Sequence, residues 1–131
     1  MSAQHRLVPI GWLKAHEQHV EQRVGELVHH FTVRECIDYA IVADERTGTV
    51  IDGHHRLEAL RRLGAAMAPA FLVDYSDPGI TVHTWREGEK APSKEEVVAR
   101  AAAGNLFPPK STRHDFVRVL DPVDVPLARL G

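Results

Sequence analysis

The sequence predicts a single mixed α/β (α+β) domain that contains a small mixed sheet and about three helices. Short runs of β-branched and apolar residues alternate along the 131 residues with longer segments whose apolar residues recur at helical spacing. Glycine- and proline-containing turns separate the two kinds of segment. With 44% hydrophobic residues, the chain can bury a core of its own, and its length is that of one domain.

The N-terminal third is expected to contain a short strand and the first helix. Leu7-Val8-Pro9-Ile10 has the apolar character of a strand, and its proline favours the edge of a sheet. From Glu17 to about Phe31, apolar residues recur every three or four positions, which predicts a helix with one buried face. Glu17 would then lie near the start of this helix, where the helix dipole favours a carboxylate.

A hairpin and a second helix are predicted next. Residues 37–44 and 49–51 have strand character, and the turn between them contains Gly48, where a positive φ is expected. The second strand runs directly into Asp52-Gly53. A helix with leucines at helical spacing begins there and ends at Gly64.

The second half is predicted to add two strands and the third helix. Residues 70–75 form a strongly apolar run, and residues 80–85 alternate between apolar and polar side chains. Ser93 followed by Glu96 is a capping box, which marks the start of a helix that ends at Gly104.

The composition argues against several classes of protein. The 16 Lys and Arg residues are balanced by 18 Asp and Glu residues, and no basic patch stands out, so we expect no nucleic-acid partner. The single cysteine, Cys36, cannot form a disulfide within the chain, and no apolar run is long enough to cross a membrane. We therefore expect a soluble cytoplasmic protein. P-loop and G-x-G-x-x-G motifs are absent.

The most informative motif is Asp52-Gly53-His54-His55-Arg56, a turn between a strand and a helix. The first turn of a helix presents backbone N–H groups without intrahelical partners, and here a glycine and a cation lie beside them. This arrangement favours phosphate binding. The alternative is a solvated helix start at the end of a hairpin.

A second cluster is His16-Glu17-Gln18-His19. Two histidines three residues apart on a helix would share a face, which would suit zinc, although the spacing is one residue shorter than H-E-x-x-H. The cluster could instead be a solvated helix start. A third interpretation is that Glu17 acts as the base for a substrate hydroxyl.

The stretch after the third helix carries a third cluster. Two prolines stiffen the loop 106–114, which includes Lys110-Ser111-Thr112-Arg113-His114. Hydroxyls and potential cations together suit a carboxylate or phosphate ligand, and the alternative is a basic surface loop. Trp85 could be a core residue, or a lid over a small ligand. Residues 115–131 are expected to form a tail of the single domain 1–131.

Taken in order, these motifs resemble the free L-serine kinases of the ParB/sulfiredoxin-like superfamily. The resemblance runs from about Leu7 to about Asp124. It rests on His16-Glu17-Gln18, Asp52-Gly53-His54-His55-Arg56, Val73-Asp74-Tyr75, Thr84-Trp85, the stretch from Ala91 to Val97, and Pro109-Lys110-Ser111-Thr112-Arg113-His114.

The resemblance implies a ParB/sulfiredoxin-like fold and an enzyme that phosphorylates free L-serine to O-phospho-L-serine, with ATP or ADP as donor and Mg²⁺. It implies that Glu17 is the general base and that Asp52 and His55 complete the catalytic group. Asp52 would place Mg²⁺ or the histidines, and no other metal ligand is implied. The nucleotide phosphates would be bound by Gly53, His54, His55, Arg56 and Lys110. Serine would be bound by Trp85, Ser111, Thr112, Arg113 and His114.

Two departures from the family pattern stand out. Longer members carry an insertion between the Trp85 strand and the third helix, and this chain joins them directly, so it resembles a compact member. Ser111 stands where threonine is usual. The partners would be L-serine and a nucleotide, and we expect a monomer or a small homo-oligomer.

Three other functions compete with this interpretation. One is a ParB-like nucleotide-binding regulatory or DNA-associated module without kinase activity. A sulfiredoxin-like reductase needs a cysteine in the phosphate turn, where this chain has His54. A kinase for threonine or homoserine is close in chemistry, because one methyl group changes binding in a pocket by only about 1–3 kcal/mol.

Overall fold

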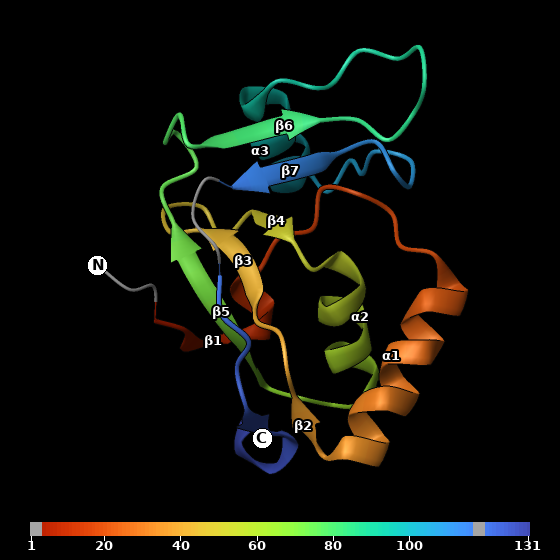
Figure 1. The fold of residues 1–131 in the computed structure, drawn as a ribbon, viewed down its shortest axis with the longest axis vertical. Coiled ribbons are helices and arrows are strands. Elements are labelled where there is room, and N and C mark those ends of the chain that lie inside the picture. Colours follow the sequence, from red (N-terminus) through yellow and green to blue (C-terminus); the bar gives the residue numbers. More distant parts are fainter. Residues whose placement is uncertain (1–3, 117–119) are drawn as a thin grey trace.

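The computed structural model describes residues 4–116 and 120–131. A four-stranded sheet lies at its centre, in the order β1, β5, β3, β4 (Figure 1). Strands β3 and β5 are parallel, and the other two pairs are antiparallel. Proline cannot donate a hydrogen bond to a neighbouring strand, and the strand that carries Pro9 lies at an edge, as predicted. The strands are β1 (Arg6–Pro9), β3 (Ile41–Asp44), β4 (Val50–Asp52) and β5 (Met67–Val73).

Helices α1 (Glu21–Arg34) and α2 (His54–Arg62) pack against each other beside the central sheet, on the right of Figure 1. The helix predicted after Asp52-Gly53 is confirmed, and Gly64 follows it with a φ of 76°. The side chains that these two helices bury belong to the predicted apolar faces and include Val24, Phe31, Leu57 and Leu60.

The upper part of Figure 1 contains a separate antiparallel pair, β6 (Ile80–His83) and β7 (Arg113–Phe116), with α3 (Lys94–Ala103) behind it. The predicted capping box is present at the start of α3. Ser93 Oγ accepts the Glu96 N–H at 3.1 Å, and the Glu96 carboxylate accepts the Ser93 N–H at 3.2 Å. These bonds satisfy two amides that the helix leaves unpaired.

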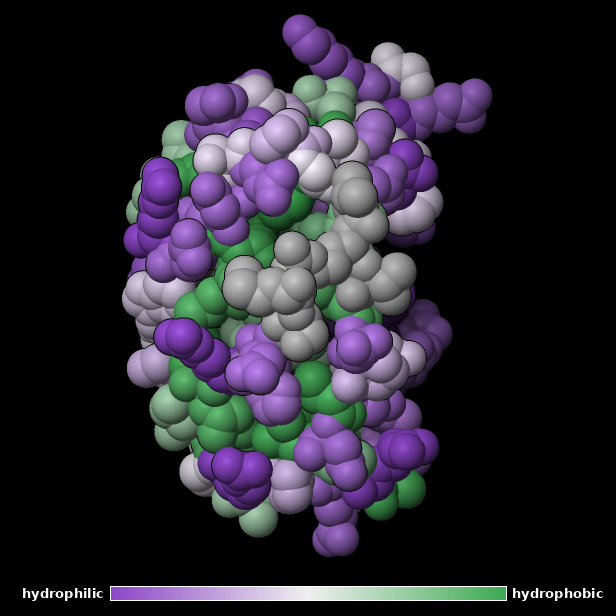
Figure 2. All heavy atoms as spheres, turned by 60° about the vertical axis from the view of Figure 1, so that its left-hand side comes forward, coloured by the Kyte–Doolittle hydropathy of each residue, from purple (hydrophilic) through white to green (hydrophobic). Residues whose placement is uncertain are grey.

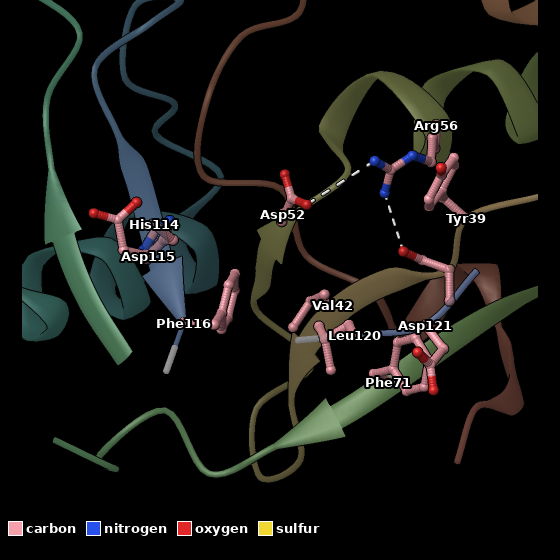
Figure 3. A pocket seen from close by; sticks show the side chains of 11 residues that line it. Tyr39, Val42, Asp52, Arg56, Phe71, His114, Asp115, Phe116, Leu120 and Asp121 are labelled. Atoms are coloured by element: carbon pink, nitrogen blue, oxygen red, sulfur yellow. Dashed lines mark hydrogen bonds and ion pairs between the residues drawn. The ribbon is translucent and has the colours of Figure 1, made fainter. Parts of the chain in front are cut away.

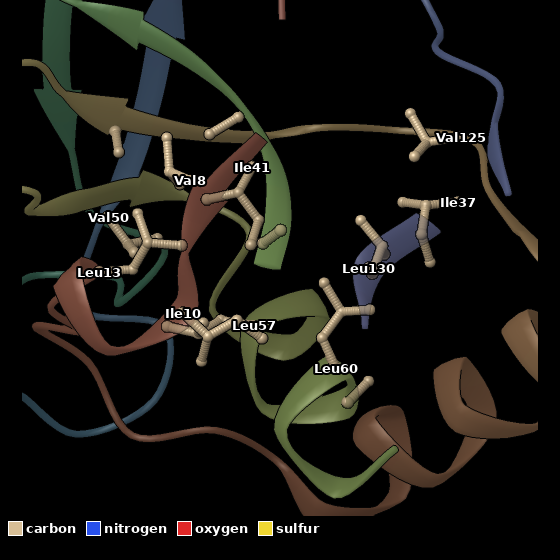
Figure 4. Close-up of a cluster of buried hydrophobic side chains, with 14 of the residues drawn as sticks. Val8, Ile10, Leu13, Ile37, Ile41, Val50, Leu57, Leu60, Val125 and Leu130 are labelled. Atoms are coloured by element: carbon tan, nitrogen blue, oxygen red, sulfur yellow. The ribbon is translucent and has the colours of Figure 1, made fainter. Parts of the chain in front are cut away.

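Alternating side chains on β3 and β4 place core on both faces of the sheet. Ile41 and Val50 join the larger hydrophobic cluster, which includes residues of α1 and α2 (Figure 4). Val42 and Ile51 point the other way and join a smaller cluster with residues such as Val97 of α3. Because both faces are covered, every residue of β3 is buried. The site described below lies at the end of β4, where the two parts of the core meet.

The first helix begins later than predicted. It starts at Glu21, because the residues before it are held in extended pairing with distant parts of the chain. Lys14 pairs with Thr49, and Glu17 pairs with Phe107. Glu17 therefore does not lie in the first turn of α1, and the prediction that the helix dipole acts on it is wrong.

The strand predicted over residues 37–44 is divided into two. The first piece, β2 (Cys36–Ile37), pairs with β8 (Val125–Pro126), and the chain enters the central sheet only at Ile41. The partner of β2 comes from the far end of the chain, so the local pattern could not reveal the division.

The segment 115–131 is more structured than the tail that we expected. It contains the end of β7, the strand β8 and the 3-10 helix η2 (Leu127–Leu130), while residues 117–119 lie outside the described residues. Val125 and Leu130 are buried in the larger cluster, so this segment contributes to the core. A second 3-10 helix, η1 (Ile10–Trp12), follows β1.

None of the helices in residues 4–116 and 120–131 combines the length and the hydrophobicity that a membrane crossing requires. Figure 2 brings the left-hand side of Figure 1 forward and shows hydrophobic residues between hydrophilic ones. This surface is therefore mixed in character.

Candidate functional site

The predicted phosphate turn has the geometry that close approach of an anion requires. Gly53 is the N-cap of α2 and has a φ of 110°, which is available to glycine but strained for other residues. A Cβ atom at this position would lie 3.1 Å from the side chains of Ile41 and Arg56. Glycine is therefore the residue that fits both this backbone conformation and the close packing of Ile41 and Arg56. The helix presents its N-terminal amides and the positive end of its dipole at this turn.

Arg56 lies across this turn and forms part of the wall of a pocket (Figure 3). Its Nη1 donates to the Ala40 carbonyl at 3.0 Å, its Nη2 is 4.0 Å from the Asp52 carboxylate, and its guanidinium is 5.9 Å from the Tyr39 ring centre. The pocket has a volume of about 430 Å³ and combines these groups with apolar side chains. Its apolar lining includes Val42, Phe71, Phe116 and Leu120.

The two histidines of the turn form hydrogen bonds to the segment that precedes α1. His54 Nε2 accepts the His16 N–H at 3.2 Å, and His55 Nε2 accepts the Val20 N–H at 3.0 Å. Both rings therefore carry their proton on Nδ1, which is the only nitrogen from which they can donate to a ligand. Burial, followed by nearby positive groups, lowers the pKa of both residues. The prediction that they donate to a ligand is therefore restricted to Nδ1.

Glu17 is enclosed by the loop that precedes β7. Its Oε1 accepts the Thr112 N–H and the Thr112 hydroxyl, each at 2.9 Å, and its Oε2 accepts the Lys110 N–H at 3.1 Å. Lys110 reaches this position with a φ of 66°, which is uncommon for a residue other than glycine. The structure thus brings together two clusters that the sequence presents 93 residues apart.

His16 was expected in a solvated helix start or as a zinc ligand, and the structure places it elsewhere. It is fully buried, and its Nδ1 lies 2.8 Å from the Val50 carbonyl while its Nε2 lies 2.9 Å from Thr112 Oγ1. The ring packs edge-on against His54, with 4.3 Å between the ring centres. His16 thereby joins the surroundings of Glu17 to the phosphate turn.

His114 also differs from the expectation, since it is not a cation of the loop. It lies on β7, accepts a hydrogen bond from the Tyr75 hydroxyl at 2.7 Å and bonds to the Ile51 carbonyl. Burial and the neighbouring His16 lower its pKa to about 3, so the ring is neutral at pH 7. Tyr75 stood in the quoted motifs without a role, and the structure shows that it orients His114.

Of the remaining predicted site residues, Ser111 contacts the loop itself, whereas Arg113 and Trp85 lie together at its edge. Ser111 is buried and donates its hydroxyl to the Pro108 carbonyl at 2.6 Å, so it stabilises the loop. Arg113 lies 5.2 Å from the Trp85 ring centre, and its Nε is buried without a hydrogen-bond partner in the described residues. Trp85 is 61% exposed, so it is not a core residue. A cation and an open aromatic face thus lie side by side at the edge of the loop.

The structure does not support the zinc interpretation of His16 and His19. His16 is buried, whereas the His19 ring points to Glu21 at 2.6 Å on the surface. Within residues 4–116 and 120–131, no group of three or more His, Cys, Asp and Glu side chains is arranged to hold a metal ion.

The buried histidines predict how stability depends on pH. Burial lowers the pKa of His16 to about 4 and that of His114 to about 3, so the folded state resists protonation that the unfolded chain accepts near pH 6.5. Stability is therefore complete above pH 6.5 and falls as the pH decreases toward 4. We expect a loss of about 1–3 kcal/mol per pH unit in this window, measured by urea unfolding. A free energy of unfolding that stays constant from pH 7.5 to 5 would contradict the burial of neutral rings.

Sequence comparison finds relatives among curated proteins, although no protein-family model matches the chain. It is 31% identical over 101 residues to the ATP-dependent L-serine kinase of Desulfurococcus mucosus. This match covers 72% of this chain and 40% of the relative. It is 32% identical over 89 residues to the ADP-dependent L-serine kinase SerK of Thermococcus kodakarensis. That match covers 65% of this chain and 37% of the relative. The chain thus matches less than half the length of these curated relatives.

Structure comparison gives a match over the whole chain. A free serine kinase in complex with AMP superposes with a TM-score of 0.92 and 19% sequence identity, over 100% of this chain and 95% of that chain. At this identity the match shows the fold, and it confirms the predicted α/β architecture with three helices and a small mixed sheet. In sequence and in fold, the chain is thus a homologue of the L-serine kinases.

Proposed function

We propose that the protein transfers a phosphoryl group from ATP or ADP to the hydroxyl of free L-serine, giving O-phospho-L-serine. The observation that carries the proposal is that the proposed base and the turn before α2 lie next to each other. The carboxylate segment at Glu17 is tied to the phosphate turn by the hydrogen bond from the His16 N–H to His54. A base and a phosphate cradle are therefore adjacent, as phosphoryl transfer to a hydroxyl requires. The named relatives support the same activity.

The nucleotide phosphates would bind at the turn before α2. The backbone N–H groups from Gly53 onward, Nδ1 of His54 and His55, and the Arg56 guanidinium are suited to contact phosphate oxygens. The pocket beside Arg56, with its aromatic and aliphatic lining, would hold the rest of the nucleotide. Lys110 is exposed, and its backbone N–H bonds to Glu17, so we assign its ammonium group to the transferred phosphate.

Asp52 fits a role in placing Mg²⁺. Its carboxylate is 57% exposed at the end of β4, next to the first amides of α2, so a phosphate-bound ion is within reach of one protein oxygen. Mg²⁺ is commonly held by one or two carboxylates together with phosphates and water. When bound, the ion would neutralise the charge that develops on the phosphate oxygens.

At the acceptor side, Glu17 would take the proton of the serine hydroxyl as the hydroxyl oxygen attacks the terminal phosphorus. The carboxylate is oriented by three donors, so it is held in one position for this transfer. Arg113, beside Trp85, is placed to pair with the serine carboxylate.

The activity is tested by ³¹P NMR of the purified protein with Mg²⁺, L-serine and either ATP or ADP. Growth of an O-phosphoserine signal establishes the reaction and identifies the donor. Threonine and homoserine in parallel samples test the specificity. Tight nucleotide binding without phosphorylation of any acceptor would contradict the proposal and favour a ParB-like nucleotide-binding module.

The substrate role of Arg113 predicts a selective effect on serine. Arg113→Ala removes the cation that would pair with the carboxylate, so we expect KM for serine to rise by roughly 10- to 100-fold, as for a lost charge-assisted hydrogen bond. The Kd for nucleotide, measured by calorimetry, should stay unchanged. An effect on nucleotide affinity alone would place this residue at the donor side.

A further inference from the structure

Glu17, Thr112 and His16 form a continuous chain of polar contacts behind the proposed base. The Thr112 hydroxyl lies 2.9 Å from Glu17 Oε1 and 2.9 Å from His16 Nε2. The far nitrogen of His16, Nδ1, lies 2.8 Å from the Val50 carbonyl. Thr112 and His16 are both buried, so bulk water does not replace these contacts.

The number of protons shared by Glu17, Thr112 and His16 can be counted from their donors and acceptors. The Val50 carbonyl only accepts, so His16 carries a proton on Nδ1. Burial lowers the pKa of His16 to about 4, which leaves Nε2 unprotonated at neutral pH. A Glu17 carboxylate also only accepts. The single hydroxyl proton of Thr112 therefore faces two acceptors, and one of the two contacts lacks a proton.

We propose that Thr112 and His16 are positioning residues that complete the hydrogen bonding of Glu17 at the moment when Glu17 accepts the proton of the substrate hydroxyl. The substrate O–H bond breaks, and an O–H bond forms at Glu17 Oε1. This new O–H group donates to Thr112 Oγ1, and the Thr112 hydroxyl turns to donate to His16 Nε2. The Thr112 O–H bond stays intact, and every contact of the chain then holds one proton.

The catalytic part of this inference rests on the proposed kinase activity. The series of contacts from Glu17 through Thr112 to His16 is present without substrate. The groups that face the His16 ring are His54 of α2, His114 of β7 and Phe107, at 4.3, 5.9 and 6.3 Å between ring centres. Burial lowers the pKa of both neighbouring histidines, so neither adds a positive charge near neutral pH. His54 Nε2 lies 3.1 Å from His16 Nδ1, so it is a second acceptor for the Nδ1 proton beside the Val50 carbonyl. The contact between His16 and Glu17 runs through Thr112.

The first test is an NMR titration of the full chain without substrate. Glu17 Cδ and His16 Nε2 are followed with ¹³C and ¹⁵N labels as the pH decreases, while amide spectra report that the protein stays folded. Because a proton on Glu17 turns the Thr112 hydroxyl toward His16 Nε2, we expect the His16 signal to change at the midpoint of the Glu17 signal. A His16 Nε2 signal that shows no change at the midpoint of the Glu17 signal would overturn the proposal.

The second test separates a positioning role from a merely structural one. In His16→Asn the amide reaches the position of Nδ1 and keeps a donor for Val50, but it offers no acceptor to Thr112. We expect kcat to fall about tenfold, as for one lost hydrogen bond, with unchanged KM values. A protonated Glu17 is then less well stabilised, so the acidic limb of the pH profile of kcat should move to lower pH.

The matched variants are His16→Gln and His29→Asn. Glutamine places an acceptor oxygen near the position of Nε2, so it should recover a large part of kcat. His29 is exposed on α1, and its replacement should change neither kcat nor the pH profile. Loss of kcat in His16→Asn without a shift of the acidic limb, or without recovery in His16→Gln, would reduce His16 to a packing role.

The two tests also distinguish this inference from the proposed function. A change of the His16 signal at the Glu17 midpoint in a protein that makes no phosphoserine would keep the proton-coupled chain and reject the kinase. Phosphoserine formation by a protein whose His16 signal shows no change at that midpoint would keep the kinase and reject the role of His16 and Thr112.

Discussion

Replacing Glu17 by Gln should reduce kcat by a factor of roughly 10²–10⁴, because glutamine cannot take the proton of the serine hydroxyl. The side chain keeps its length, and its oxygen can still accept the two bonds from Thr112. Its NH₂ group would face the Lys110 N–H, so one of the three contacts is lost. The rate is measured as phosphoserine formation by ³¹P NMR.

The control for this variant is the affinity for nucleotide, measured by calorimetry on the same preparation. It should be unchanged, because Glu17 contacts the loop and not the phosphate turn. Glu26→Gln makes the same chemical change on the exposed side of α1 and should leave the rate unchanged. If Glu17→Gln turned over at the wild-type rate, Glu17 would not be the base. An equal loss of rate and nucleotide affinity would make it a structural residue of the loop.

Replacing Arg56 by Ala should weaken nucleotide binding by roughly 10- to 150-fold, because a charge-assisted hydrogen bond to a phosphate contributes about 1.5–3 kcal/mol. The guanidinium lies over the turn and forms part of the pocket wall, between Asp52 and the Ala40 carbonyl (Figure 3). The Kd for ADP and for ATP is measured by calorimetry in the presence of Mg²⁺.

Arg61→Ala is the matched control for this prediction. Arg61 lies on the same helix, near its C-terminal end, and pairs with Glu58 on the surface, so its loss should not change nucleotide affinity. Thermal unfolding of both variants shows whether α2 remains stable. Unchanged affinity in Arg56→Ala would remove Arg56 from the phosphate site and leave the backbone amides of α2 as its main donors.

The local features of the fold could be predicted because their causes lie within a few residues. The capping box at Ser93, the turn at Gly48 and the strand–turn–helix unit around Gly53 depend on hydrogen bonds and dihedral angles of neighbouring residues. The same holds for the apolar faces of α1 and α2. The start of α1 was misplaced because Glu17 pairs with Phe107, and local spacing carries no information about that partner.

In the candidate site, too, the features with local causes could be predicted and those that depend on distant partners could not. The strand–turn–helix unit proposed to bind phosphate could be predicted because one continuous segment contains its glycine, its helix start and its arginine. The protonation of the site could not be predicted, because burial decides it. His114 was counted among the potential cations of the loop, and in the structure burial lowers its pKa while Tyr75 holds the ring. The burial of His16 could not be predicted for the same reason.

The sequence by itself determined the number of helices, most of the central strands, the glycine turn before α2 and the residue types in the proposed site, since these follow from local conformation and side-chain chemistry. Only the tertiary structure decided that the loop around Thr112 encloses Glu17 and that His16 joins this carboxylate to the phosphate turn. The physical reason is that hydrogen bonds between residues up to 96 positions apart, and the burial that accompanies them, arise only when the whole chain is packed.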